Sequence, residues 1–397
     1  MNDLERRLGA YPETSHAAQA KGRGTLLLVV GGMHGNEPAG VLAARRVLET
    51  LGELRPDVHG RIVCLAGNVG ALREGLRYRS RDLNRLWEPQ AIERARAARD
   101  IESEDEEARE QRELLWEIEE HLAGSWERVA LLDLHSTSAV GAPFSIMGDT
   151  LQNRGVAFAL GVPVILGLEE RIDGTLLSYF SERGHTAVCV EGGQNDLPET
   201  VEHHEAAIWI SLHSLGMIAE ADVPALEEKR GLLATAARGL PKVIEIRHRQ
   251  DVPDEIDFAM RPGFANFHRI HDGELLGWFC EPGEEDVAPG QRKEVRTPLD
   301  GLLLMPRYQG QGNDAFFVGR EVRRTWLAVS AVLRRLRLQW ILPLLPGVRA
   351  VEGRTRRLRV DGHIARWDVL EILHLFGYRR CSAEGEQLEF VRRADRL

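Results

Sequence analysis

The sequence predicts an α/β protein: a three-layer α/β/α domain with a mostly parallel or mixed sheet, then a small β domain and a C-terminal α+β tail. Between residues 25 and 215, short β-rich runs alternate with longer helical stretches. Near residue 240 the pattern changes to short alternating runs separated by Gly, Pro and Asp. After residue 320 an apolar, Arg-rich helix leads into further short segments. The predicted domains are 1–238, 239–320 and 321–397.

The first domain contains several runs that are typical of buried strands. The candidates are TLLLVV, RIVCLAGN, VALLDLH, PFSIMG, VPVILG and TAVCVEGG. Helices are predicted over PAGVLAARRVLETL, over residues 90–123 and over ETVEHHEAAIWISLHSLGMI. Within 90–123, the acidic run contains Leu114, Leu115, Ile118 and Leu122 at helical spacing, so it is interpreted as the solvated face of an amphipathic helix.

Composition limits the function classes. The formal charge of −10 over 397 residues argues against a nucleic-acid-binding protein, whose affinity depends on clustered Lys and Arg. The four cysteines lie far apart without CxxC spacing, which is typical of reduced thiols in a cytoplasmic protein. The N-terminus lacks an apolar signal region, and no apolar stretch reaches the roughly 18 residues of a membrane span. No membrane partner is therefore expected.

The predicted tail differs in charge from the rest of the chain. Residues 321–397 contain 16 Arg against 9 Asp and Glu, about +7, which leaves about −17 for the other residues. The tail is therefore expected to be a separate module that docks on an acidic body. Its role, and whether the chain forms a homo-oligomer, stay open.

Two polar residues follow the first buried strand of the first domain. In LLVVGGMHGNEPAG, His34 and Glu37 come where four aliphatic residues end, a position at which polar groups need a partner or a function. His nitrogen and carboxylate oxygen are ordinary Zn²⁺ ligands, and a catalytic zinc takes three from the protein. His135 at the end of VALLDLH is the best third candidate, with Asp133 placed to orient it. Each residue alone could equally be structural.

The run RYRSRDLNRLW is rich in carboxylate-binding groups. Arg77, Arg81 and Arg85 fall within nine positions, with Asn84 beside the last. A guanidinium can bind a carboxylate through two parallel hydrogen bonds, so the run suits a carboxylate-bearing substrate. The alternative is an Arg-rich loop that forms salt bridges with the acidic helix after it.

A further carboxylate, Glu191, ends the apolar run TAVCVEGG. The paired glycines after it would let the chain turn sharply. A carboxylate near a zinc ion that does not need it as a ligand can accept a proton from water. The alternative roles for Glu191 are a helix cap or an ion-pair partner.

HGNEPAG, RDLNR, LLDLHSTS and VEGG occur in this order and at a spacing that resembles the succinylglutamate desuccinylase/aspartoacylase family, a branch of the zinc carboxypeptidase-like metallohydrolases. The resemblance covers residues 25–215 well and the β domain more loosely. It implies a zinc-carboxypeptidase-like fold and one Zn²⁺ per chain. The residues that it assigns to the metal are His34, Glu37 and His135.

The same resemblance implies the roles of four other residues. Glu191 would be the general base, and Arg77 would help to polarise the carbonyl group that is cleaved. Asn84 and Arg85 would hold the carboxylate of the amino-acid part of the substrate. The family's acyl-selecting Tyr and Arg have only Tyr179 and Arg183 as counterparts here, without the expected spacing, and Tyr308 is the candidate in the second domain.

The candidate residues are compatible with three functions. The first is a zinc hydrolase that removes an acyl group from a small N-acyl amino acid. The second is a carboxypeptidase-like or ester hydrolase acting on a peptide, a cell-wall fragment or another carboxylate-bearing substrate, since the same groups would serve it. The third is a metal-binding protein without catalysis, against which the presence of a general base argues. The ligands would also accept Co²⁺ or Mn²⁺.

Overall fold

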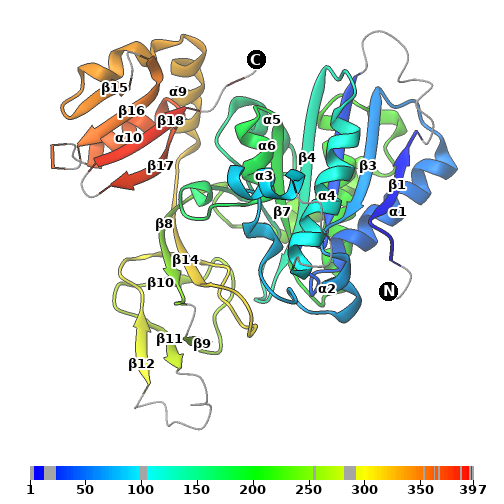
Figure 1. The fold of residues 1–397 in the computed structure, drawn as a ribbon, viewed down its shortest axis with the longest axis horizontal. Coiled ribbons are helices and arrows are strands. Elements are labelled where there is room, and N and C mark those ends of the chain that lie inside the picture. The colour runs from blue at the N-terminus through cyan, green and yellow to red at the C-terminus, as the bar shows by residue number, and fades with distance from the viewer. Residues whose placement is uncertain are drawn as a thin grey trace.

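The structure is a computed structural model, and it describes residues 4–12, 24–97, 105–253, 256–280, 292–351, 354–361, 363–364, 367–384, 387–392 and 395. Figure 1 shows an α/β body, a small β region beneath it and a C-terminal lobe beside it.

One large sheet organises the body. Among the described residues it contains eleven strands: β1 (Arg7–Tyr11), β2 (Thr25–Gly31), β3 (Gly60–Ala66), β4 (Arg128–Thr137), β5 (Phe144–Ile146), β6 (Val164–Leu166), β7 (Thr186–Gln194), β8 (Val243–Asp251), β10 (Arg269–Ile270), β13 (Gly301–Leu304) and β14 (Asp314–Glu321). The order is β1-β3-β2-β4-β7-β5-β6-β8-β14-β13-β10. Strands β3, β2, β4 and β7 run parallel, whereas β1 and β5 are antiparallel to a neighbour, so the sheet is mixed.

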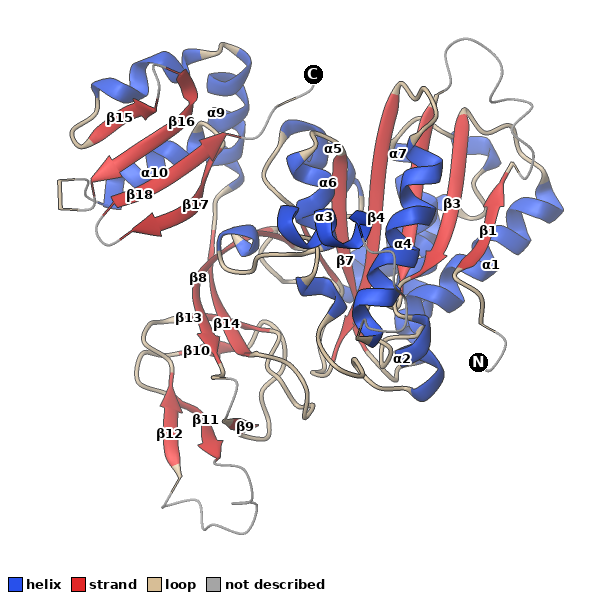
Figure 2. Ribbon diagram, in the orientation of Figure 1, coloured by secondary structure: helices blue, strands red, loops and turns tan. Residues whose placement is uncertain are grey.

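Helices cover both faces of this sheet (Figure 2). The helical elements of the body are α1 (Ala39–Leu54), α2 (Val69–Glu74), η2 (Leu83–Arg85), α3 (Pro89–Ala97), α4 (Glu106–Leu122), α5 (Leu151–Ala159), η3 (Leu168–Glu170), α6 (Leu176–Glu182), α7 (Pro198–Ser214), η4 (Glu220–Asp222) and α8 (Leu226–Ala236). In β2, Leu27 and Val29 pack with α1 and α7, whereas Leu26 and Leu28 pack with α4 and α6. Because alternate residues of a strand face opposite sides, every apolar residue of β2 is buried. The predicted three-layer α/β/α architecture is confirmed.

The acidic run is the amphipathic helix that its spacing predicts. Leu114, Leu115 and Ile118 are fully buried on α4, and the Asp105 side chain accepts a hydrogen bond from the Ala108 amide at its N-terminus. The first residues of the run, 101–104, lie outside the described residues.

The small β region continues the sheet of the body. Strand β8 pairs in parallel with β6 on one side and antiparallel with β14 on the other. A second sheet of three strands lies beyond, formed by β9 (Asp257–Met260), β11 (Leu275–Cys280) and β12 (Lys293–Arg296). The sequence boundary at residue 239 therefore falls just before a strand that joins the two regions.

The C-terminal lobe has its own apolar core. Its elements are α9 (Arg324–Arg335), η6 (Leu338–Leu344), β15 (Val348–Val351), β16 (Arg354–Asp361), α10 (Trp367–Leu375), β17 (Tyr378–Glu384) and β18 (Gln387–Arg392). The single Arg-rich helix expected after residue 320 is wrong, because Arg337 adopts a left-handed conformation with φ of 53° and separates α9 from η6.

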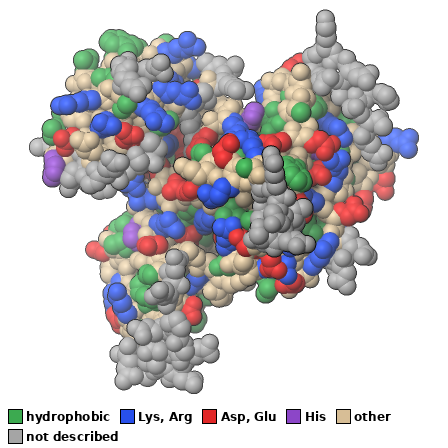
Figure 3. Space-filling view, viewed as in Figure 1, with side chains coloured by type: hydrophobic (Ala, Val, Ile, Leu, Met, Phe, Trp, Pro, Cys, Tyr) green, Lys and Arg blue, Asp and Glu red, His purple; other side chains and the backbone are tan. Residues whose placement is uncertain are grey.

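Ion pairs join the lobe to the body. Arg379 of β17 donates to Asp149 at 3.1 Å and to Glu170 at 3.3 Å, and its side chain is 6% exposed. Basic side chains outnumber acidic ones on the visible face of the lobe (Figure 3). The lobe thus presents arginine to buried carboxylates of the body, as its charge leads one to expect.

His374 lies in the same interface and predicts a pH dependence. Its Nδ1 lies 3.0 Å from Glu245 Oε1 and its Nε2 lies 3.4 Å from Glu170 Oε1. Burial and Arg379 lower the pKa of His374, but the two carboxylates outweigh them and raise it. Burial raises the pKa of Glu170, whereas His374 and Arg379 lower it, to about 2.

A folded pKa above the unfolded value means that protonated His374 stabilises the protein below a pH of about 6.5, and that this contribution disappears as the pH rises through the folded pKa. The free energy of unfolding, measured with urea, is expected to fall between pH 6 and pH 8.5 for this reason. His374→Gln should make that fall smaller, and His59→Gln, at an exposed histidine, should leave it as in the wild type. An equal fall in wild type and His374→Gln would show that His374 is not responsible.

None of the helices in the described ranges is both long and apolar enough to cross a membrane.

Candidate metal centre

The turn after β2 places the first two candidate ligands. Gly35 lies against the backbone of Ala71 in α2, where a Cβ atom would clash, so the segment HGNE can pass only with glycine there. His34 is 5% exposed and Glu37 is 3% exposed. The short connection from β2 to α1 therefore holds an imidazole and a carboxylate in a buried position.

Glu37 contacts both histidines. Its Oε1 lies 2.9 Å from His34 Nδ1, and its Oε2 lies 3.0 Å from His135 Nδ1 on β4. One ligand atom from each of the three residues lies within 4.8 Å of the other two. Burial raises the pKa of Glu37, but His34 and His135 outweigh it and lower the pKa far below its usual range, so the group is a carboxylate. The three residues could hold one metal ion.

Each histidine lies close to a second carboxylate. His34 Nε2 lies 3.1 Å from Asp82 Oδ1, and His135 Nε2 lies 3.3 Å from Asp133 Oδ1. Asp82 forms a hydrogen bond to its ring, whereas Asp133 Oδ1 makes an ion-pair contact and has no hydrogen-bond partner among the described residues. With Nε2 beside a carboxylate, Nδ1 of each ring faces Glu37, and metal-binding histidines usually have a carboxylate at their other nitrogen. Asp133 was predicted in this role and Asp82 was not, although it lies within the quoted RDLNR. The sequence signal for Asp82 was its position two residues before Asn84. Asp82 Oδ1 accepts a hydrogen bond from the Asn84 backbone N–H at 2.8 Å and so caps η2.

Glu191 lies beside this group on the neighbouring strand. It is the register partner of His135 across β4 and β7, and it is 7% exposed. Its Oε2 has no hydrogen-bond partner among the described residues. Burial raises the pKa of Glu191 to about 7, a shift to which Glu37 adds and which His135 opposes. A carboxylate with a free oxygen and a raised pKa is suited to exchange a proton.

The glycines after Glu191 do not form the predicted sharp turn. Strand β7 continues to Gln194, so that expectation is wrong. A Cβ atom on Gly192 would lie 2.6 Å from His204 Nε2. The glycine is thus required for the close approach of α7 to β7.

The Arg-rich run divides between two roles. Arg77 points to the centre, with Nη1 3.2 Å from Glu37 Oε1 and Nη2 3.4 Å from Asp82 Oδ2. Arg81 is instead half-exposed and pairs with Asp105 before α4. Arg81 therefore fits the alternative interpretation of a loop paired with the acidic helix, whereas binding of a substrate carboxylate by this run stays a prediction.

The two residues predicted to hold the substrate carboxylate contact protein groups. Asn84 Nδ2 lies 3.4 Å from His135 Nε2, and its Oδ1 accepts from the Leu176 amide at 2.9 Å. Arg85 donates to Asp314 Oδ2 at 3.0 Å and to the Asn84 carbonyl at 2.9 Å. Both line the cavity described next, and their role toward a substrate stays a prediction.

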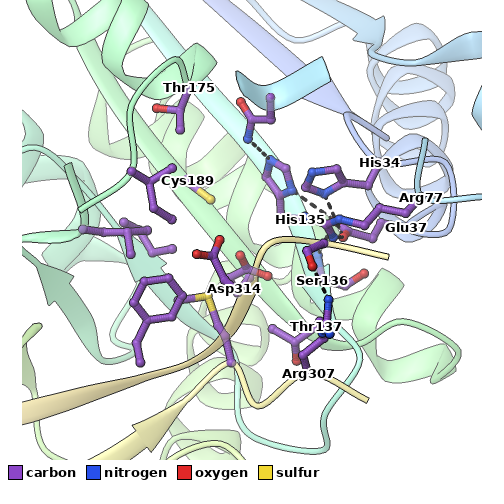
Figure 4. A pocket seen from close by; sticks show the side chains of 18 of the residues that line it. His34, Glu37, Arg77, His135, Ser136, Thr137, Thr175, Cys189, Arg307 and Asp314 are labelled. Atoms are coloured by element: carbon purple, nitrogen blue, oxygen red, sulfur yellow. Dashed lines mark hydrogen bonds and ion pairs between the residues drawn. The ribbon is translucent and has the colours of Figure 1, made fainter. Parts of the chain in front are cut away.

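A cavity opens onto the three candidate ligands. Figure 4 shows His34, Glu37, His135 and Arg77 grouped at one side, with Arg307 and Asp314 from the β region below. Glu191, Glu169 and Cys189 also line it. Arg307, Asp314 and Glu169 were missed because no motif marks them. Tyr179, Arg183 and Tyr308 are not among the lining residues: the Arg183 guanidinium stacks on the buried Tyr179 ring, and the Tyr308 hydroxyl contacts the Phe264 backbone.

Comparison with known proteins gives a family match and several partial relatives. Residues 23–207 match the model described as "Succinylglutamate desuccinylase/Aspartoacylase catalytic domain". The succinylglutamate desuccinylase of Pseudomonas syringae pv. tomato is 41% identical over 71 residues, which are 17% of this chain and 21% of that protein. That of Paraburkholderia xenovorans is 36% identical over 78 residues, 18% and 23% of the two chains. The chain therefore matches about a fifth of the length of these curated relatives.

Solved structures show the same fold. A succinylglutamate desuccinylase/aspartoacylase from Rhodobacter sphaeroides superimposes with a TM-score of 0.53 at 21% identity, covering 76% of this chain and 87% of that chain. The ectoine utilization protein of Ruegeria pomeroyi, in a product-bound structure, gives a TM-score of 0.53 at 20% identity, covering 76% and 86%.

Proposed function

Because residues 23–207 belong to the succinylglutamate desuccinylase/aspartoacylase family, we propose that this chain is a zinc-dependent hydrolase that removes an acyl group from a small N-acyl amino acid. The observation that carries the proposal is the convergence of His34, Glu37 and His135 beside the unpaired carboxylate oxygen of Glu191.

The residues fit a zinc ion by their chemistry. Two imidazole nitrogens and one carboxylate are a frequent catalytic zinc set, which leaves a coordination position open. Asp82 and Asp133 lie beside Nε2 of the two rings, and both Nδ1 atoms face Glu37. A bound zinc ion supplies Lewis acidity, which polarises a carbonyl group and makes water acidic enough to attack at neutral pH.

The other residues act on protons and charge. Glu191 would accept the proton of the attacking water at its free Oε2 and pass it to the leaving amine nitrogen, which breaks the amide into a carboxylate and an amine. Arg77, held by Glu37 and Asp82, would stabilise the negative charge that develops on the carbonyl oxygen. The amino-acid part of the substrate would lie toward Asn84 and Arg85, at the η2 side of the cavity.

Metal removal tests the proposal. The purified full chain is expected to contain one zinc per chain by elemental analysis and to hydrolyse at least one member of a panel of N-acyl amino acids. Dialysis against a chelator should abolish hydrolysis, and added Zn²⁺ should restore it, because the polarising ion is lost and regained. Restoration by Co²⁺ or Mn²⁺ alone would correct the metal.

The same assay separates the alternatives. Cleavage of C-terminal residues from short peptides, with no action on N-acyl amino acids, would favour the carboxypeptidase-like function. One tightly bound metal without hydrolysis of any amide or ester would favour a binding protein.

A further inference from the structure

The far wall of the cavity carries an ion pair where a free guanidinium is expected. Arg85 donates to Asp314 Oδ2 at 3.0 Å, and Arg249 donates to Asp314 Oδ1 at 2.5 Å. Asp314 lines the cavity and its side chain is 16% exposed. One carboxylate of the protein thus binds two guanidinium groups, one with each oxygen.

The positions of these groups are fixed by regular structure. Asp314 begins β14 and is the register partner of Asp251 on β8, the strand that also carries Arg249. Arg249 Nη1 donates to the Arg171 carbonyl at 2.6 Å. Because backbone pairing holds Asp314 and a carbonyl holds Arg249, Asp314 is part of the wall.

Arg85 and Asn84 have further protein partners. The second donor of Arg85 contacts the Asn84 carbonyl, and both ends of the Asn84 amide are occupied by His135 and Leu176. A substrate carboxylate that approached Arg85 from this wall would lie beside Asp314 and compete with it for the Nη2 donor. The two carboxylates would then share one site, which is unfavourable.

A second carboxylate in the cavity wall points the same way. The Glu169 side chain is 2% exposed, and neither of its oxygens makes a hydrogen bond to a described residue. The nearest cation is Arg379 of the C-terminal lobe, 3.6 Å away. Buried acceptors without hydrogen bonds favour a ligand that brings N–H donors.

We propose that Asp314 is a specificity-determining residue: its negative charge beside Arg85 disfavours a substrate carboxylate at this end of the cavity and favours a neutral or cationic group such as a carboxamide or an ammonium. The reaction in this inference is the proposed amide hydrolysis, so that part rests on the proposed function. The preferred charge of the bound group does not depend on hydrolysis. It narrows the substrate to an N-acyl compound whose group near Arg85 carries no negative charge.

Matched pairs of compounds test this. The panel pairs N-acetyl-aspartate with N-acetyl-asparagine and N-acetyl-glutamate with N-acetyl-glutamine, and the members of a pair differ in charge but little in shape. It also contains the α-amides of all four compounds, and Nα-acetyl-lysine as a cationic compound. Hydrolysis by the zinc-loaded wild type is measured for each, and binding to the zinc-loaded Glu191→Gln variant is measured by calorimetry. We expect the uncharged or cationic member of a pair to be favoured at least about tenfold in kcat/KM and in affinity.

Variants of Asp314 complete the experiment. Asp314→Asn should shift the ratio at least about tenfold toward the carboxylate, because it removes the negative charge beside Arg85. The single variant is used for kcat/KM, and its combination with Glu191→Gln is used for affinity. Asp251→Asn, which removes an exposed charge from the paired strand, is the matched control and should leave the ratio unchanged. Should Asp314→Asn not fold, the wild-type ratios still decide.

The outcomes separate this inference from the proposed function. A wild type that favours the carboxylate member of every pair overturns the inference, as does an Asp314→Asn protein with an unchanged ratio. Preferential binding of uncharged members without hydrolysis of any compound supports the inference and contradicts the hydrolase proposal. Absence of binding by the whole panel overturns the inference too.

Discussion

Glu191→Gln is expected to lower kcat by about 10² to 10⁴ while the chain keeps its fold and its metal. An amide cannot accept a proton from water, and the position of Glu191 beside His135 on the neighbouring strand makes it the group that would do so. The side chain is buried and one of its oxygens has no partner in the described part of the chain, so the isosteric change removes little packing. Steady-state kinetics, elemental analysis and circular dichroism measure the three properties.

A matched control is available on the same region of the chain. Glu182→Gln changes an exposed carboxylate at the end of α6 and should leave kcat within about twofold of the wild type. Near-normal turnover by Glu191→Gln would assign Glu191 a structural role. Loss of metal along with activity would instead make it a ligand.

The candidate metal centre can be predicted from the sequence because its signals are local. His34, Glu37, His135 and Glu191 each follow or end an apolar run, and the carboxyl ends of parallel strands meet at one edge. Three such runs are neighbours in the sheet, so sequence order and strand pairing agree. Asp82 was within reach as well, since an Asp two residues before Asn84 is a common cap.

The substrate end of the cavity could not be predicted in the same way. Asp314 reaches Arg85 across 229 positions of sequence, and Arg379 approaches Glu169 from a separate lobe. Such contacts depend on how β8, β14 and β17 are placed, and no periodicity or spacing marks them. A motif shows that Arg85 is present, but it does not show that Arg85 already has a partner. This is why the structure brings the three predicted ligands together, whereas Arg85, predicted to hold a substrate carboxylate, is paired with Asp314 of the protein.

Arg77→Ala is expected to lower kcat by about 10² to 10³ with a smaller change in KM, because a guanidinium that meets charge developing during the reaction contributes mainly to the transition state. The geometry favours this role over binding alone. Arg77 is 15% exposed, it lines the cavity, and its two terminal nitrogens are held by Glu37 and Asp82, which also orient the candidate ligands. Its Nε has no hydrogen-bond partner among the residues that the structure describes.

The control for Arg77 lies four residues along the same run. Arg81→Ala removes a half-exposed guanidinium that pairs with Asp105, and it should leave both kcat and KM nearly unchanged, since exposed ion pairs contribute little. Arg77→Lys keeps the charge but not the fork that spans Glu37 and Asp82, so it should recover only part of kcat. Because Arg77 also contacts Glu37, metal content must be measured in each variant. A fall in kcat at full zinc occupancy supports stabilisation of the carbonyl oxygen, whereas a fall that tracks zinc loss would place Arg77 among the groups that hold Glu37 in position.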